Sequence, residues 1–165
     1  MIPLQNRFPG LSWQLNCSVA NFKNHIGLLL SRVEHDRCHL EETFGISRRA
    51  KLNWLNPYAG DEHRGGQATT VIRFSDGNKV VYKPRSLAID HQFNKLLSEL
   101  NKELGQKHFR TLLSLPVGES YGYQEFVEAE NCQSEDEFSD YFSHLGMLLG
   151  ILLVLGAPDC PPGHL

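Results

Sequence analysis

Apolar side chains between residues 18 and 45 recur every three or four positions, which predicts an amphipathic helix. Gly45 is typical of a helix C-terminus, so we expect the helix to stop there. The predicted apolar face consists of Phe22, Ile26, Leu29, Leu30 and Val33. The predicted solvated face carries Glu34, Asp36, Glu41 and Glu42.

Two more helices are expected in the second half of the chain. The first covers residues 86–104, and the second covers residues 138–155 after an acidic surface loop at 128–137. The apolar face of the first consists of Ile89, Phe93, Leu96, Leu97 and Leu100. The second contains the longest apolar run, residues 147–155, and we expect it to be buried. Trp13 and Trp54 are expected to be packing residues.

Alternating or β-branched segments predict a small sheet. Asp76-Gly77-Asn78 is a strong hairpin signal, because these residues tolerate positive φ. The expected strands and extended segments are residues 50–54, 69–74, 79–83, 112–117 and 121–127. Helices flanking a small antiparallel sheet define an α+β fold.

The order of these elements resembles the N-terminal lobe of a kinase, continued through a hinge into the first helix of the second lobe. In that comparison residues 121–127 form the hinge-side strand, with residues 124–126 near a nucleotide base.

Composition narrows the classes of function. The chain has 165 residues, 41% of them hydrophobic, and a net charge of −3, which argues against nucleic-acid binding through a basic surface. None of the four cysteines forms a Cys-x-x-Cys pair, so we expect free thiols in a reducing cytosol and no zinc site. Residues 1–10 lack the apolar core of a signal peptide, and the run at 147–155 is too short to cross a membrane.

The candidate chemistry lies around the predicted hairpin. A polar loop with Gly65 and Gly66 precedes it, and its second strand ends on Lys83, followed by Arg85. Glycines let a backbone approach a phosphate, and a lysine and an arginine supply compensating charge. The alternative interpretation is a surface lysine at a strand end beside an ordinary turn.

Asp61 and His63 lie in the same loop. A carboxylate two positions from a histidine can orient it for acid–base chemistry near neutral pH. Asp-x-His alone also fits a turn-forming aspartate beside a solvated histidine.

Four segments together resemble the dehydratase domain of class II (LanM-type) lanthipeptide synthetases. They are GDEHRGG at 60–66, FSDGNKVVYKPRSL at 74–87, YGYQEFV at 121–127 and LGAPDC at 155–160. The resemblance covers roughly residues 20–160, in order and with compatible spacing.

The resemblance implies a lipid-kinase-like domain that uses ATP and Mg²⁺. Such a domain phosphorylates Ser and Thr of a ribosomal precursor peptide, with its leader, and then eliminates phosphate to give dehydroamino acids. It implies that Lys83 contacts the ATP phosphates and that Arg85 supports this contact. Asp61 and His63 would serve elimination, and Asp159 would open the catalytic Asp-x-His-x-x-Asn motif.

The resemblance breaks off inside that motif. Pro161 stands where the family has His, and His164 stands where it has Asn. We therefore expect an N-terminal extension at 1–17 and a truncated dehydratase domain at 18–165, without the second lobe or the zinc cyclase domain. A fragment of a frameshifted gene is expected neither to phosphorylate nor to dehydrate a peptide alone. The alternatives are a nucleotide- or leader-peptide-binding remnant and an inactive product.

Overall fold

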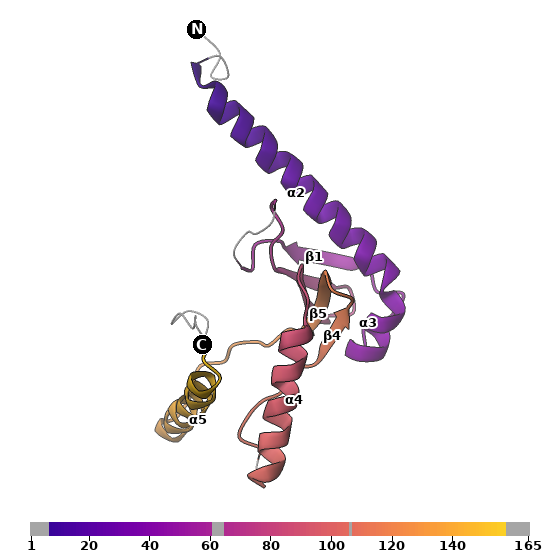
Figure 1. The fold of residues 1–165 in the computed structure, drawn as a ribbon. Coiled ribbons are helices and arrows are strands. Elements are labelled where there is room, and N and C mark those ends of the chain that lie inside the picture. Colours follow the sequence, from indigo (N-terminus) through magenta and orange to yellow (C-terminus); the bar gives the residue numbers. More distant parts are fainter. Residues whose placement is uncertain (1–6, 61–64, 106, 158–165) are drawn as a thin grey trace. The chain divides into compact units, whose positions relative to one another are not determined.

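The computed structural model describes residues 7–60, 65–105 and 107–157. Within these residues the fold is α+β with a small antiparallel sheet, as predicted, and it has four helices and five strands (Figure 1). The helices are α2 (Pro9–His35), α3 (Arg37–Phe44), α4 (Ala88–Glu103) and α5 (Glu135–Val154). The strands are β1 (Leu52–Asn56), β2 (Thr70–Phe74), β3 (Lys79–Lys83), β4 (Ser114–Val117) and β5 (Tyr121–Glu125).

The chain divides into two compact units, and the boundary falls within α4. The first unit comprises Met1–Gln92 and Leu112–Phe126, and it contains the sheet with α2 and α3. The second comprises Phe93–Thr111 and Val127–Leu165, and it contains most of α4 and all of α5.

The strand order is β1-β2-β3-β5-β4, so β3 and β5 lie in the interior of the sheet. The predicted hairpin joins β2 to β3, with Gly77 at φ 92° and the Asp76 carboxylate accepting a hydrogen bond from the Asn78 N–H at 3.1 Å. Strand β3 pairs with β5 and not with β4, the next strand in the sequence. After β3 the chain leaves the sheet, forms α4, and returns to the sheet at β4.

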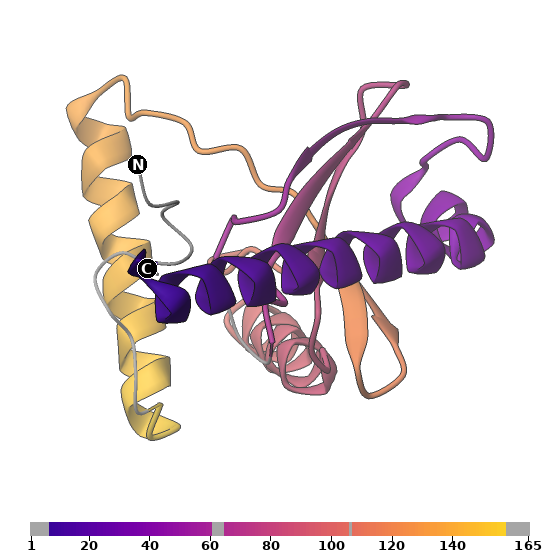
Figure 2. The same ribbon diagram turned by 90° about the horizontal axis from the view of Figure 1, so that it is seen from above.

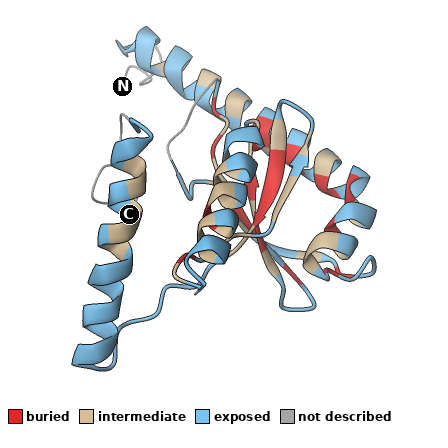
Figure 3. Ribbon diagram, turned by 60° about the horizontal axis from the view of Figure 1, so that its bottom comes forward, coloured by how far each residue is buried: buried red, intermediate tan, exposed pale blue. Residues whose placement is uncertain are grey.

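The core lies on one face of the sheet. Strand side chains alternate between faces, and alternate residues of β2 and β3 are fully buried, among them Ile72, Phe74 and Tyr82. They pack against Leu29 of α2 and Leu40 of α3 in a single cluster. Figure 2 shows α2 lying along the sheet, and Figure 3 shows buried residues gathered in the strands.

The helix predicted for residues 18–45 is two helices, and the first begins at Pro9 rather than at residue 18. Gly45 ends α3 at φ 70°, as predicted. Asp36 separates the two helices with φ −92° and ψ 10°, and it is only 1% exposed. The prediction that Asp36 lies on a solvated face was wrong, because its side chain turns inward to a hydrogen-bond partner on β5.

Several predicted packing residues are exposed. Trp13 and Trp54 are more than half exposed, and Phe22 and Leu30 of α2 are also exposed. Ile89 is exposed because it lies about 80° around α4 from the buried Leu97, outside the buried stripe.

The acidic loop is shorter than predicted, and the last helix is less buried. Helix α5 begins at Glu135, where the Ser134 hydroxyl accepts a hydrogen bond from the Glu137 N–H. None of the residues of α5 is buried, so the prediction of a buried helix over residues 147–155 was wrong. None of the described helices is both long and apolar enough to cross a membrane.

Candidate functional site

One end of the sheet collects three segments that are distant in sequence. Strand β2 starts at Thr70 beside Tyr82, and β5 starts with Tyr121 and Gly122, the latter opposite Lys83. The loop that leads into β2 therefore attaches at the end where Lys83 terminates β3. Its base is closed by a hydrogen bond from the Ala59 N–H to the Thr69 carbonyl at 3.0 Å.

Lys83 is held by a carboxylate from the next helix. Its Nζ lies 3.2 Å from Oδ1 of Asp90, in the first turn of α4. Arg85 binds the same carboxylate with both terminal nitrogens, at 2.5 Å to Oδ2 and 3.0 Å to Oδ1. Sequence reasoning singled out both cations but missed Asp90. The only available signal was an acidic residue in the first turn of the helix that follows the strand.

The charges of this cluster stabilise one another. Burial alone raises the pKa of the Asp90 carboxyl, but the Arg85 hydrogen bonds and the charges of Lys83 and Arg85 outweigh burial and lower it. The hydrogen bonds to Asp90 raise the pKa of the Arg85 guanidinium, despite its burial. With two cations and one carboxylate, the cluster keeps a net charge of about +1, which suits an incoming anion.

Gly122 lets the strand approach this cluster closely. A Cβ at position 122 would meet the Leu87 side chain at 2.6 Å and the Leu115 carbonyl oxygen at 2.7 Å. Leu87 is fully buried. In the sequence it belongs to the segment between β3, which ends on Lys83, and the start of α4. Only a glycine fits here, so the absence of a side chain at Gly122 fixes the position of the segment that links Lys83 to Asp90.

Lys83 lies on the face of the sheet opposite the core. Tyr82 belongs to the core, and successive residues of a strand point to opposite faces. Val71, Val81 and Gln124 pair across three neighbouring strands and share the face of Lys83. This row is apolar apart from one amide, and two of its members are buried: Val71 is 9% exposed and Gln124 is 7% exposed. Val81 is half-buried and lies two residues before Lys83.

Gly65 and Gly66 have φ of 75° and 89°, which explains why glycines occupy both positions. The loop that contains these two glycines joins the sheet at the same end as Lys83. Three predicted catalytic residues, Asp61, His63 and Asp159, lie outside the described residues, so their roles stay predictions.

A second polar network, missed from the sequence, ties α2 to the core face of the sheet. Arg32 donates to the Tyr82 hydroxyl at 2.5 Å, and its guanidinium lies 4.0 Å from the centre of the Tyr121 ring. One turn further along, Asp36 accepts a hydrogen bond from the Tyr123 hydroxyl at 3.0 Å. Arg32 of α2 and Asp36, which directly follows that helix, thus engage tyrosines of two adjacent strands, and one of these tyrosines precedes Lys83.

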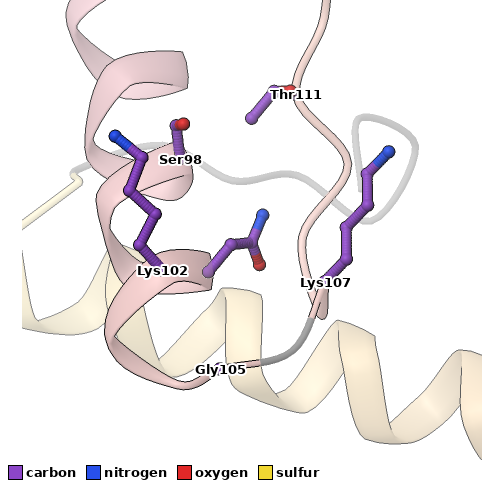
Figure 4. Close-up of a pocket in the computed structure, with 6 residues that line it drawn as sticks. Ser98, Lys102, Gly105, Lys107 and Thr111 are labelled. Atoms are coloured by element: carbon purple, nitrogen blue, oxygen red, sulfur yellow. The ribbon is translucent and has the colours of Figure 1, made fainter.

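The second unit contains a polar pocket of about 490 Å³ at the C-terminal end of α4 (Figure 4). It is lined by Ser98, Asn101, Lys102, Gly105, Lys107 and Thr111. Lys102 pairs with Glu99 at 2.8 Å, and the Asn101 amide bonds both backbone groups of Phe109. Lysines at a helix C-terminus compensate its exposed carbonyls, and the amide pins the following loop. These contacts give Lys102 and Asn101 a structural role at the end of α4.

The same unit also has an apolar groove of about 480 Å³ between α4 and α5. Leu96, Leu100 and Leu104 line it from α4, and Met147 and Ile151 are among the residues that line it from α5. No group of three or more metal-ligating side chains occurs among the described residues.

Comparison with known proteins assigns the family. The profile of a family described as a domain of unknown function (DUF4135) matches residues 8–164, and the chain belongs to this family. The chain is also similar to the lacticin 481/lactococcin biosynthesis protein LcnDR2 of Lactococcus lactis subsp. lactis, with 23% identity over 163 residues. The alignment covers 94% of this chain but 17% of that protein, so the chain spans about one sixth of the relative's length.

Proposed function

We propose that the chain forms the nucleotide-binding part of a kinase-like dehydratase domain in lanthipeptide biosynthesis. The observation that carries this proposal is the ion pair between Lys83 at the end of β3 and Asp90 in the following helix. Kinases use such a lysine–acid pair to hold the lysine against ATP phosphates. The similarity to a lacticin 481/lactococcin biosynthesis protein supports the same pathway.

In this proposal Lys83 and Arg85 receive the phosphates of ATP, and Asp90 keeps both cations at the site. The loop backbone at Gly65 and Gly66 approaches the phosphates at the same end of the sheet. Val81, which is half-buried on the same face as Lys83, contacts the base. ATP enters as a complex with Mg²⁺. Because the described residues offer no cluster of three metal ligands, we assign the ion no protein ligand and no step.

The substrate is a ribosomal precursor peptide with its leader, in the cytoplasm where ATP is available. A Ser or Thr hydroxyl oxygen attacks the γ-phosphorus, the bond to the β-phosphate oxygen breaks, and ADP leaves. Elimination then removes the α-proton, forms a double bond between the α- and β-carbons, and releases phosphate. We assign Asp61 and His63 to elimination and Asp159 to phosphoryl transfer, with residues 18–165 as part of the dehydratase domain.

Calorimetric titration with ATP and Mg²⁺ tests the nucleotide site. Lys83→Met should weaken binding about 10- to 100-fold, the effect of losing one charged hydrogen bond to phosphate. Lys95→Met is the matched control, because this exposed lysine of α4 carries the same charge away from the cluster. It should bind ATP as the unmodified chain does.

Thermal melting of both variants separates lost binding from lost folding. Equal ATP affinity in Lys83→Met and Lys95→Met would contradict the proposal, as would the absence of binding by the folded, unmodified chain.

A further inference from the structure

The N-terminal half of α2 has no buried residue. Burial in this helix begins at His25 and continues at Leu29 and Val33, which pack on the sheet. From Pro9 to Asn24 every residue is exposed or half-exposed. At 1.5 Å per residue this stretch is roughly 24 Å long, and Figure 1 shows it continuing past the strands.

The exposed half nevertheless keeps the apolar stripe of the buried half. Leu11, Leu15, Val19 and Phe22 follow the spacing of a single helix face, and Leu29 and Val33 continue that face into the core. The first four side chains are 44%, 55%, 52% and 40% exposed, respectively. A face that is suited to packing thus continues beyond the sheet that covers its other half.

The same stretch lacks the charges of a solvated helix. No Asp, Glu, Lys or Arg occurs between Phe8 and Phe22, and the flanking charges are Arg7 and Lys23. Charged residues make up about a quarter to a third of a typical soluble surface. An uncharged helix with an exposed apolar stripe is typical of an interface.

We propose that this stretch pairs antiparallel with the same stretch of a second copy of the chain. The stripe is symmetric about Leu15, because Leu11 and Val19 lie four positions on either side of it. Phe22 lies seven positions after Leu15, and Phe8, the N-cap residue of the helix, lies seven positions before it. A two-fold axis at Leu15 therefore places Leu15 against Leu15, Leu11 against Val19 and Phe8 against Phe22 of the second copy. Such self-complementarity is what an isologous dimer interface requires.

The size and charge of the surface predict how the dimer behaves. About five half-exposed side chains from each copy bury roughly 1,000 Å² in total, slightly below the range of stable specific interfaces. Interfaces of this size are typical of weak, transient association, so the fraction of dimer should depend on protein concentration. The axis also sets Arg7 against Lys23 of the second copy, so added salt should tighten the dimer by screening this repulsion.

Sedimentation equilibrium of the purified chain from about 1 to 200 μM tests the proposal. Leu15→Glu sets two carboxylates against each other on the axis, and it should raise the dissociation constant at least about 100-fold. Trp13→Glu is the matched control, because Trp13 is 68% exposed on the opposite side of the same helix. This variant should change the constant less than about threefold.

Because both positions are exposed, far-UV circular dichroism should show both variants folded. A monomer throughout the concentration range overturns the proposal. So does a dimer that survives in Leu15→Glu, which would place the contact elsewhere, or one that both variants weaken equally.

Discussion

At the scale of single residues, Asp90 determines what Lys83 can do. A lysine at a strand end is free to sample many rotamers, whereas Lys83 is held at 3.2 Å from a carboxylate that also binds Arg85. The carboxylate organises the two cations, which carry one positive charge more than Asp90 does. A phosphate group would therefore meet donors that are already in place.

Gly122 is the residue at which a small change should cost most stability. Gly122→Ala places a methyl group 2.6 Å from the Leu87 side chain and 2.7 Å from a carbonyl oxygen, so we expect a loss of about 1–3 kcal/mol. The matched control is Gly146→Ala in α5, where a Cβ meets nothing within 4 Å. Chemical denaturation should show a large loss for the first variant and a small gain in helix stability for the second. Equal effects would contradict the close packing at Gly122.

The buried tyrosines predict a loss of stability in alkali. Burial, followed by the nearby Asp36, raises the pKa of Tyr121 to about 12, and burial also raises the pKa of Tyr82 and Tyr123. A tyrosine of the unfolded chain ionises near 10, so the fold favours the protonated hydroxyls. Their contribution is fully present below about pH 10 and is lost as the pH rises through the folded pKa values.

Denaturation at a series of pH values checks this prediction. The free energy of unfolding should fall from about pH 10 to 12, and Tyr121→Phe should fall less steeply because it lacks one of the titrating hydroxyls. Lysines titrate in both proteins, so the difference between the two curves isolates the tyrosine. Superimposable curves would contradict the raised pKa of Tyr121.

At the scale of elements, local signals predicted more than long-range contacts. Gly45, the hairpin at Asp76–Asn78 and the end of β3 at Lys83 were predicted because turn chemistry is local. The inward turn of Asp36 was not predictable, since its partner Tyr123 lies 87 positions away. Helical periodicity identified the apolar face from Phe22 to Val33 but missed its continuation towards Pro9, because residues 1–17 were expected to be an extension.

The start of α5 was readable from the sequence but was missed. Ser134 and Glu137 form a variant of the capping box. The Ser134 hydroxyl accepts the Glu137 N–H at 3.2 Å, and the Glu137 carboxylate accepts the N–H of Gln133, one residue before the N-cap, at 2.6 Å. Ser134→Ala should destabilise the first turn by about 1 kcal/mol. Hydrogen exchange of the amides of residues 135–138 should become faster.

Ser143→Ala, an exposed position in the middle of α5, is the control for this change. It should leave exchange in the first turn unchanged, because alanine is a good helix former there. Unchanged exchange in Ser134→Ala would mean that the capping box does not hold the helix start.

At the scale of the whole molecule, the chain is an α+β member of its family, and it is similar to a part of a much longer protein. It spans 17% of the length of the lacticin 481/lactococcin biosynthesis protein LcnDR2. The sequence predicted the fold class and one part of the candidate site, the cations at the end of β3. The predicted acid–base residues Asp61, His63 and Asp159 lie outside the described residues, and their roles still need direct tests.

The most direct test of the nucleotide site is an NMR titration of the ¹⁵N-labelled chain with ATP and Mg²⁺. We predict that the shifted amides cluster at one end of the sheet, at Gly65–Gly66, Lys83–Asp90 and Tyr121–Gly122. In Lys83→Met the same shifts should need about 10- to 100-fold more ATP. Shifts confined to the pocket at the end of α4, or no shifts at millimolar ATP, would contradict the account.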